Sequence, residues 1–100
     1  MKTPVIHTLH YTIYLESYMN NSFIHCDCYK WNKSIKRTML QDVNTLVQIH
    51  GKPLLAIHEI DDKKHLKFLE LLGFTYHSNF EGMDNTMRQL YVKEFKIGDK

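Results

Sequence analysis

The stretch "HLKFLELLGFTYH", residues 65–77, decides the fold of this chain. Its leucines recur at helical spacing, and the run stops at Gly73, where an aromatic, strand-like segment begins. Glycine here indicates a helix end, because the left-handed conformation typical of that position costs a residue with a Cβ about 1 kcal/mol or more. The stretch therefore predicts a helix over residues 62–72, capped by Asp61 or Asp62, that leads into a strand.

The segments on either side alternate between helix and strand. Apolar residues at helical spacing predict a long helix over residues 34–50, with Ser34 as its N-cap and Gly51 just after its end. The apolar run "LLAIHEI" predicts a buried, parallel-type strand in the centre of a sheet. After the second helix, "FTYHSNF" and "MRQLYVKEF" flank a polar loop and predict an antiparallel pair.

Two more strands are predicted before the long helix. Residues 5–15 alternate with period two and predict one strand with one buried face. The turn-forming cluster "ESYMNNS" separates it from residues 23–31, which predict a strand covered on both faces. The expected order is strand, strand, helix, strand, helix, strand, strand, that is, a mixed α/β (α+β) sheet in one domain over residues 1–100, with a tail at 96–100 that frays.

Composition excludes several classes of protein. The chain has 100 residues, 43% hydrophobic and 24% charged, which is typical of a soluble globular domain. No apolar run approaches the roughly 18–20 residues of a membrane helix, and no signal peptide is apparent. The net charge of +2 is too small to announce nucleic-acid binding. We expect a protein of the cytoplasm.

The order of segments resembles the C-terminal half of the GNAT acetyltransferase superfamily, over residues 22–95. The likeness rests on the Asp-capped helix, on "KFLELLGF" at residues 67–74, and on the closing strand that contains Tyr91. It implies a GNAT-like sheet that is truncated at its N-terminal side.

Within that superfamily the chain is most similar to small GNAT-like proteins of short-tailed bacteriophages, including a minor internal virion protein. Those proteins share a basic segment before the long helix and the step from His65 to Phe68 and Leu69. The similarity implies a location in the host cytoplasm or the virion.

Two departures from the superfamily bear on function. GNAT enzymes hold the coenzyme A pyrophosphate with a glycine-containing loop at the start of the long helix, whereas residues 1–50 of this chain contain no glycine. Many GNAT enzymes also place a proton-donating tyrosine where this chain has Leu69. The sequence therefore predicts no catalytic residue and no cofactor.

Cysteine and histidine side chains do not form an evident metal or nucleophile site. In "HCDC", a strand places Cys26 and Cys28 on one face and His25 and Asp27 on the other, so the four cannot surround one ion. No cue for a lowered thiol pKa is present, which disfavours a cysteine nucleophile. His65 lies on the apolar stripe of its helix and is interpreted as a packed, hydrogen-bonded histidine.

One basic cluster precedes and opens the long helix. Four cations and Trp31 lie together without an acid, and Tyr29 stands beside them; the candidate interaction residues are Tyr29, Lys30, Trp31, Lys33, Lys36 and Arg37. Such a cluster suits an acidic protein surface or phosphate, with Trp31 as an anchor. If a cofactor binds at all, the expected contacts are Lys33, Ser34, Lys36 and Arg37.

Three hypotheses follow. The leading one is a non-catalytic, pseudoenzyme-like GNAT module that acts as a virion structural protein or binds a host protein. The alternative is a minimal acetyl-coenzyme A-dependent N-acetyltransferase. The third, supported only by the basic cluster, is a nucleic-acid-binding module.

Overall fold

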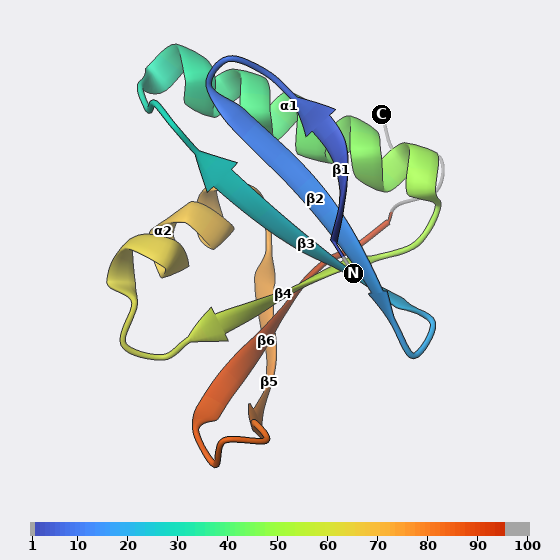
Figure 1. Ribbon diagram of the computed structural model, residues 1–100, viewed down its shortest axis with the longest axis vertical. Helices are drawn as coiled ribbons and strands as arrows, with labels where there is room; N and C mark the ends of the chain where they lie inside the picture. Colours follow the sequence, from blue (N-terminus) through green and yellow to red (C-terminus); the bar gives the residue numbers. More distant parts are fainter. Residues whose placement is uncertain (1, 96–100) are drawn as a thin grey trace.

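A six-stranded mixed sheet carries two helices in the computed structural model, which describes residues 2–95 (Figure 1). The sheet order is β1-β2-β3-β4-β6-β5, and every neighbouring pair is antiparallel except β3 with β4. Along the chain the elements are β1 (Lys2–His7), β2 (Tyr11–Tyr18), β3 (Asn21–Cys28), α1 (Lys33–His50), β4 (Leu54–Glu59), α2 (Lys63–Leu71), β5 (Thr75–Glu81) and β6 (Met87–Lys93). The predicted fold class is confirmed, and the tail at 96–100 lies outside the described residues.

The core lies between one face of the sheet and the two helices. Alternate residues of each strand point to the same face, and the strand registers place the buried Tyr11, Ile13, Leu54 and Ala56 together on it. The buried helix residues that cover them are Ile35, Met39, Val43, Val47 and Leu69, with Leu72 directly after α2. We call this the helix-covered face and the opposite one the open face.

The long helix begins one residue earlier than predicted. Its cap is Asn32, whose side-chain oxygen accepts a 2.9 Å hydrogen bond from the N–H of Ile35, so the Ser34 assignment is wrong. Gly51 ends the helix at φ 73°, as predicted. Ile49 is apolar but exposed, because it lies two residues after the buried Val47 and so on another side of the helix.

The second helix, predicted over residues 62–72, is one residue shorter at each end, with Asp62 and Leu72 as its caps. Asp62 accepts a 3.0 Å hydrogen bond from the N–H of His65 at its start. At its end Gly73 has φ 86°, its N–H bonds to the carbonyl of Glu70, and the N–H of Phe74 bonds to the carbonyl of Leu69. These two bonds form the Schellman motif, in which the residue after the helix has a positive φ. The prediction that Gly73 ends the helix because of its left-handed conformation is therefore confirmed.

The N-terminal prediction is wrong in two respects. Residues 5–15 form a hairpin rather than one strand, because the hydroxyl of Thr8 accepts hydrogen bonds from the N–H groups of His10 and Tyr11 and turns the chain. The order therefore contains one more strand than expected. In addition, β3 is not covered on both faces, since its last two residues are exposed. The turn that was predicted to precede residues 23–31 is confirmed: it lies between β2 and β3, at Met19 and Asn20.

No helix among the described residues has the length and hydrophobicity needed to cross a membrane.

Candidate functional site

β3 and β4 lie side by side at one end and then separate. Their parallel pairing comprises only Ser22 with Leu54 and Phe23 with Leu55. Beyond these pairs, residues 24–28 of β3 and the end of β4 diverge, and Figure 1 shows α2 beside the opening. Strand edges that do not pair present backbone N–H and C=O groups that can bind an extended ligand.

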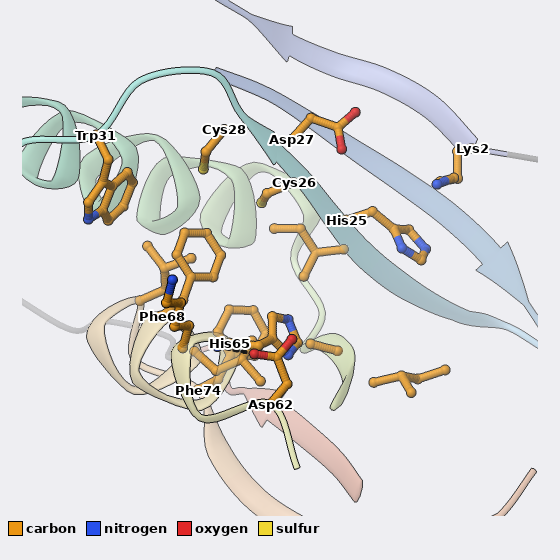
Figure 2. A pocket seen from close by; sticks show the side chains of 16 residues that line it. Lys2, His25, Cys26, Asp27, Cys28, Trp31, Asp62, His65, Phe68 and Phe74 are labelled. Carbon is orange, nitrogen blue, oxygen red and sulfur yellow. Dashed lines mark hydrogen bonds between the residues drawn. The ribbon is translucent and has the colours of Figure 1, made fainter. Parts of the chain in front are cut away.

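A cavity of about 670 Å³ occupies this opening, which we call the cleft. That volume is in the range of small-molecule sites. Successive residues of a strand point to opposite faces, so a lining that includes residues 24–28 in sequence runs around the edge of β3 and joins the two faces of the sheet. Figure 2 shows its lining residues: Lys2, Ile24, His25, Cys26, Asp27, Cys28, Trp31, Ala56, Ile57, Asp62, Lys64, His65, Phe68, Leu69, Leu72 and Phe74.

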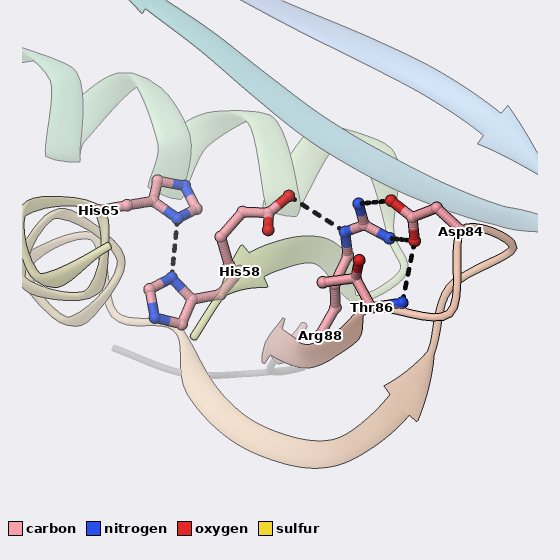
Figure 3. Close-up of polar contacts among 6 residues, drawn as sticks. His58, His65, Asp84, Thr86 and Arg88 are labelled. Carbon is pink, nitrogen blue, oxygen red and sulfur yellow. Dashed lines mark hydrogen bonds and ion pairs between the residues drawn. The ribbon is translucent and has the colours of Figure 1, made fainter. Parts of the chain in front are cut away.

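A histidine pair lies at the α2 side of the cleft. Nδ1 of His58 is 3.0 Å from Nδ1 of His65 (Figure 3), and the two rings are stacked with centroids 5.2 Å apart. His58 is 1% exposed, and its ring also meets the ring of Tyr91 edge-on. Burial is the largest of the causes that lower the pKa of His65. The predicted hydrogen-bonded His65 is therefore present, but its partner could not be read from the sequence.

Both cysteines line the cleft as thiols. Burial raises the pKa of Cys26 to about 12, and burial followed by the charge of Asp27 raises the pKa of Cys28. Neither is an activated nucleophile, because a thiol attacks as its thiolate. Among residues 2–95 no group of three or more His, Cys, Asp or Glu side chains could hold a metal ion.

A second, basic cavity opens beside the cleft. Its volume is about 360 Å³, and its lining residues are Trp31, Lys36, Lys64, Lys67, Phe68 and Leu71. We call it the lysine cavity, because three cations and no acid line it. Trp31, Lys64 and Phe68 line the cleft as well, so the two spaces are adjoining.

The lysine cavity contains only part of the predicted basic cluster. Trp31 and Lys36 line it, whereas Lys30, Lys33 and Arg37 are exposed and line neither it nor the cleft. Ser34 is likewise exposed outside both spaces, and the hydroxyl of Tyr29 is 2.6 Å from that of Thr12. That these residues contact a partner or a cofactor stays a prediction. Lys64 and Lys67 were missed, since only tertiary structure brings α2 next to the start of α1.

A third cavity lies on the open face of the sheet. It measures about 400 Å³ and is mostly apolar, with Glu16, Tyr18, Phe23, His25, Ile57, Ser78, Phe80 and Leu90 as its lining. Nε2 of His25 is 3.0 Å from a carboxylate oxygen of Glu16. His25 and Ile57 line both this cavity and the cleft. The open-face cavity and the cleft therefore meet at these two residues.

Comparisons with known proteins identify the fold. No protein-family model and no curated protein sequence matches the chain. Among solved structures, the ribosomal-protein-S5-alanine acetyltransferase of Vibrio fischeri matches with a TM-score of 0.69 at 12% identity, over 91% of this chain and 57% of that one. The microcin C7 self-immunity acetyltransferase, in complex with acetyl-CoA and AMP, matches with a TM-score of 0.62 at 16% identity, over 86% of this chain and 54% of that one.

A third structure, the NatC complex bound to Gag peptide and CoA, matches with a TM-score of 0.61 at 10% identity, over 86% of this chain and 60% of that one. The chain thus spans little more than half the length of the proteins it matches. At these identities the likeness shows the fold alone, which is GNAT-like.

Two predictions are corrected by these matches. A non-catalytic virion or host-interaction module was expected, yet the similar structures are acetyltransferases. No cofactor was expected, yet one of these structures holds acetyl-CoA. The prediction of no cofactor rested on the lack of glycine in residues 1–50 and on the leucine at position 69. Each of these features concerns one contact to a cofactor and says nothing about whether the cleft is present. The similarity to bacteriophage proteins stays a prediction.

Proposed function

We propose that the chain binds acetyl-coenzyme A in the cleft and transfers the acetyl group to an amine. The observation that carries this proposal is the divergence of β3 from β4 after a two-residue parallel pairing, which leaves two facing strand edges around a cavity of about 670 Å³. The pantetheine arm of coenzyme A is extended and contains two amides. Such a chain can bond to strand edges as an added strand does.

The lysine cavity suits the phosphate groups of the same molecule. A glycine loop brings backbone N–H groups to phosphate; here Lys36 at the start of α1 and Lys64 and Lys67 on α2 supply charge instead. The first turn of α1 contains no acidic side chain that would repel an anion. The indole of Trp31 offers an aromatic surface for the adenine ring.

The open-face cavity suits the acceptor. Its walls are mostly apolar, and the Glu16 carboxylate is paired with His25, which lies where the cavity meets the cleft. An apolar wall with one carboxylate matches a primary amine on an apolar body, because the carboxylate attracts the ammonium group and the wall buries the rest. Acceptor and acetyl donor would then approach one another from opposite faces, at the edge of β3.

Acetyl-coenzyme A supplies an activated acyl group as a thioester, and this chain's residues supply its binding and orientation. Positioning alone can supply a large part of the rate acceleration, because two reactants that are bound side by side react in an effectively unimolecular step. Phe68, Leu69 and Phe74 form an apolar wall of the cleft that excludes water from the reacting groups.

Binding of acetyl-coenzyme A tests the proposal directly. Isothermal titration and thermal unfolding of the wild type are expected to show saturable binding; at 100 times the dissociation constant the ligand adds about 2.7 kcal/mol to the free energy of unfolding. Two substitutions at one cleft position provide the matched pair. Cys28→Ser keeps the cleft open and should bind as the wild type does, whereas Cys28→Trp fills it and should weaken binding about tenfold or more. Absence of binding by the wild type at millimolar acetyl-coenzyme A would contradict the proposal.

A further inference from the structure

His58 and His65 contact each other through their Nδ1 atoms, and each of these nitrogens can either carry a proton or accept a hydrogen bond. A hydrogen bond between two Nδ1 atoms 3.0 Å apart requires that one nitrogen carries the proton and the other accepts it. If both rings were imidazolium, both Nδ1 atoms would be donors and the contact would repel. The pair therefore holds one extra proton at most.

Burial decides which ring takes that extra proton. His58 is 1% exposed between the sheet and α2, whereas His65 is only half-buried and lines the cleft. A charge is less costly on the more exposed ring. A protonated His65 must then donate its Nδ1–H to His58, and its second nitrogen, Nε2, is the one that gains and loses the proton. Figure 3 shows this second nitrogen on the side of the ring away from His58.

His65 also lies where a proton carrier is needed. It comes four residues, one helical turn, before Leu69, which lines the same cleft and cannot transfer a proton. The two cysteines of the cleft are poor acids, because desolvation and the charge of the neighbouring Asp27 raise the pKa of both thiols.

We propose that His65 is the proton-transfer residue of the cleft and that His58 is its positioning residue, which accepts the Nδ1–H of His65 and so keeps Nε2 free for the reaction. This inference rests on the proposed acetyl transfer. It extends that function by assigning a proton carrier that neither the sequence motif nor the structural matches indicate.

The proton balance is closed within the cleft. An acceptor that arrives as an ammonium group first releases one proton to solvent. The nitrogen of the neutral amine then forms a bond to the acetyl carbon and loses one more proton, while the bond from that carbon to sulfur breaks and the sulfur gains one proton. Neutral His65 accepts the proton from nitrogen at Nε2 and then gives it to sulfur. His65 ends as it began, and His58 stays neutral throughout with its own proton on Nε2.

The charged and titratable groups around His65 are compatible with this role. His58 contacts it from β4, and the charges of Glu59 at the end of β4 and of the capping Asp62 act to raise its pKa. Lys64 lies on its own helix, and Cys26, Cys28, His25, Asp27 and Lys2 line the cleft with it. The lowered pKa of His65 keeps the ring neutral, and hence able to accept a proton, at neutral pH. We expect the rate of transfer to fall only as the pH drops below the ordinary value for histidine, about 6.5.

Nitrogen NMR of the histidine rings tests the pair without any ligand. At neutral pH we expect His65 to carry its proton on Nδ1 and His58 on Nε2, and Nε2 of His65 to gain a proton on acidification. A His65 ring that is protonated on Nε2 at neutral pH would overturn the proposal.

Kinetics test the role itself, with acetyl-coenzyme A as donor and hydroxylamine as a small amine that needs no shaped acceptor site. We expect His65→Gln to lower the rate about 100-fold or more while the dissociation constant of acetyl-coenzyme A changes less than about threefold. His58→Leu should lower the rate about tenfold or more, and His58→Asn, whose side-chain oxygen can accept the same hydrogen bond, should restore most of it.

The possible failures are distinguishable. If the wild type does not bind acetyl-coenzyme A, the proposed function fails and the role of His65 with it. If the wild type binds and accelerates the reaction but His65→Gln reacts equally fast, only the role of His65 is overturned. If the wild type binds and gives no acceleration over free solution, the proposed acetyl transfer is overturned together with the role of His65. Equal rates for His58→Leu and His58→Asn would overturn the positioning role.

Discussion

The ring centroids of Trp31 and Phe68 lie 5.6 Å apart, which joins the segment before α1 to the middle of α2. The contact is the first in a series of rings that continues through His65 and His58 to Tyr91. It holds the two helices so that lysines from both surround one cavity. The lysine cavity and the cleft are therefore parts of one arrangement, and changes in one should be felt by a ligand of the other.

Charge reversal in the lysine cavity should weaken acetyl-coenzyme A. We expect Lys64→Glu with Lys67→Glu to raise its dissociation constant about tenfold or more, because two attractions for phosphate become repulsions, and to reduce the salt dependence of binding. Lys30→Glu with Lys52→Glu is the matched control, since those two lysines are exposed outside the cavity. Isothermal titration at two salt concentrations measures both effects. An equal loss in the control would show that only overall charge matters.

Alkylation of the cysteines should report on occupancy of the cleft. Both thiols have raised pKa values, that of Cys26 about 12, so iodoacetamide should react slowly at neutral pH and faster as the pH rises. The exposed Cys28 should react before the less exposed Cys26. Saturating acetyl-coenzyme A should slow both reactions, which peptide mass spectrometry can follow. Alkylation rates that do not change with ligand would contradict binding in the cleft.

Two glycines with positive φ provide a matched pair for stability. Gly51→Ala should lower the free energy of unfolding by about 1 kcal/mol, because the left-handed backbone is strained for alanine and nothing lies within 4 Å of the added Cβ. Gly73→Ala should cost more. Its Cβ would lie 2.6 Å from Nζ of Lys93, which donates a hydrogen bond to the carbonyl of Leu72 and would have to move. Urea titration of both variants measures the difference, and equal losses would show that Lys93 moves without cost.

Acid should weaken the hairpin between β5 and β6 through Asp84. The side chain of Arg88, and next the N–H of Thr86, hold the pKa of Asp84 at about 2, below its ordinary 3.8 (Figure 3). A lowered pKa gives stability that is present above pH 3.8 and is lost as the pH falls through 2. Melting temperatures between pH 5 and 2 should thus fall less steeply for Asp84→Asn than for the wild type. Asp61→Asn, which removes another exposed carboxylate, is the control. If the melting temperature of Asp84→Asn falls with pH as steeply as that of the wild type, the prediction is refuted.

Local signals in the sequence determined most of the elements. Gly73 and Asp62 define the ends of α2, and Gly51 the end of α1, because capping depends on the φ angle or side-chain oxygen of single residues. Period-two alternation identified strands but not the hairpin turn at Thr8, since the alternation of apolar residues continues through it. The mixed sheet followed from the alternation of helices and strands.

Only the tertiary structure decided where chemistry can occur. The sequence shows β3 and β4 as two strands but not that they separate after Phe23 and Leu55, because their pairing depends on how the whole sheet twists. Likewise Lys36 and Lys64, or His58 and His65, are ordinary residues in sequence. They become part of a basic cavity and a hydrogen-bonded pair once α2 packs beside β4 and the start of α1. Local propensity is a property of neighbours along the chain, whereas a binding site is a property of neighbours in space.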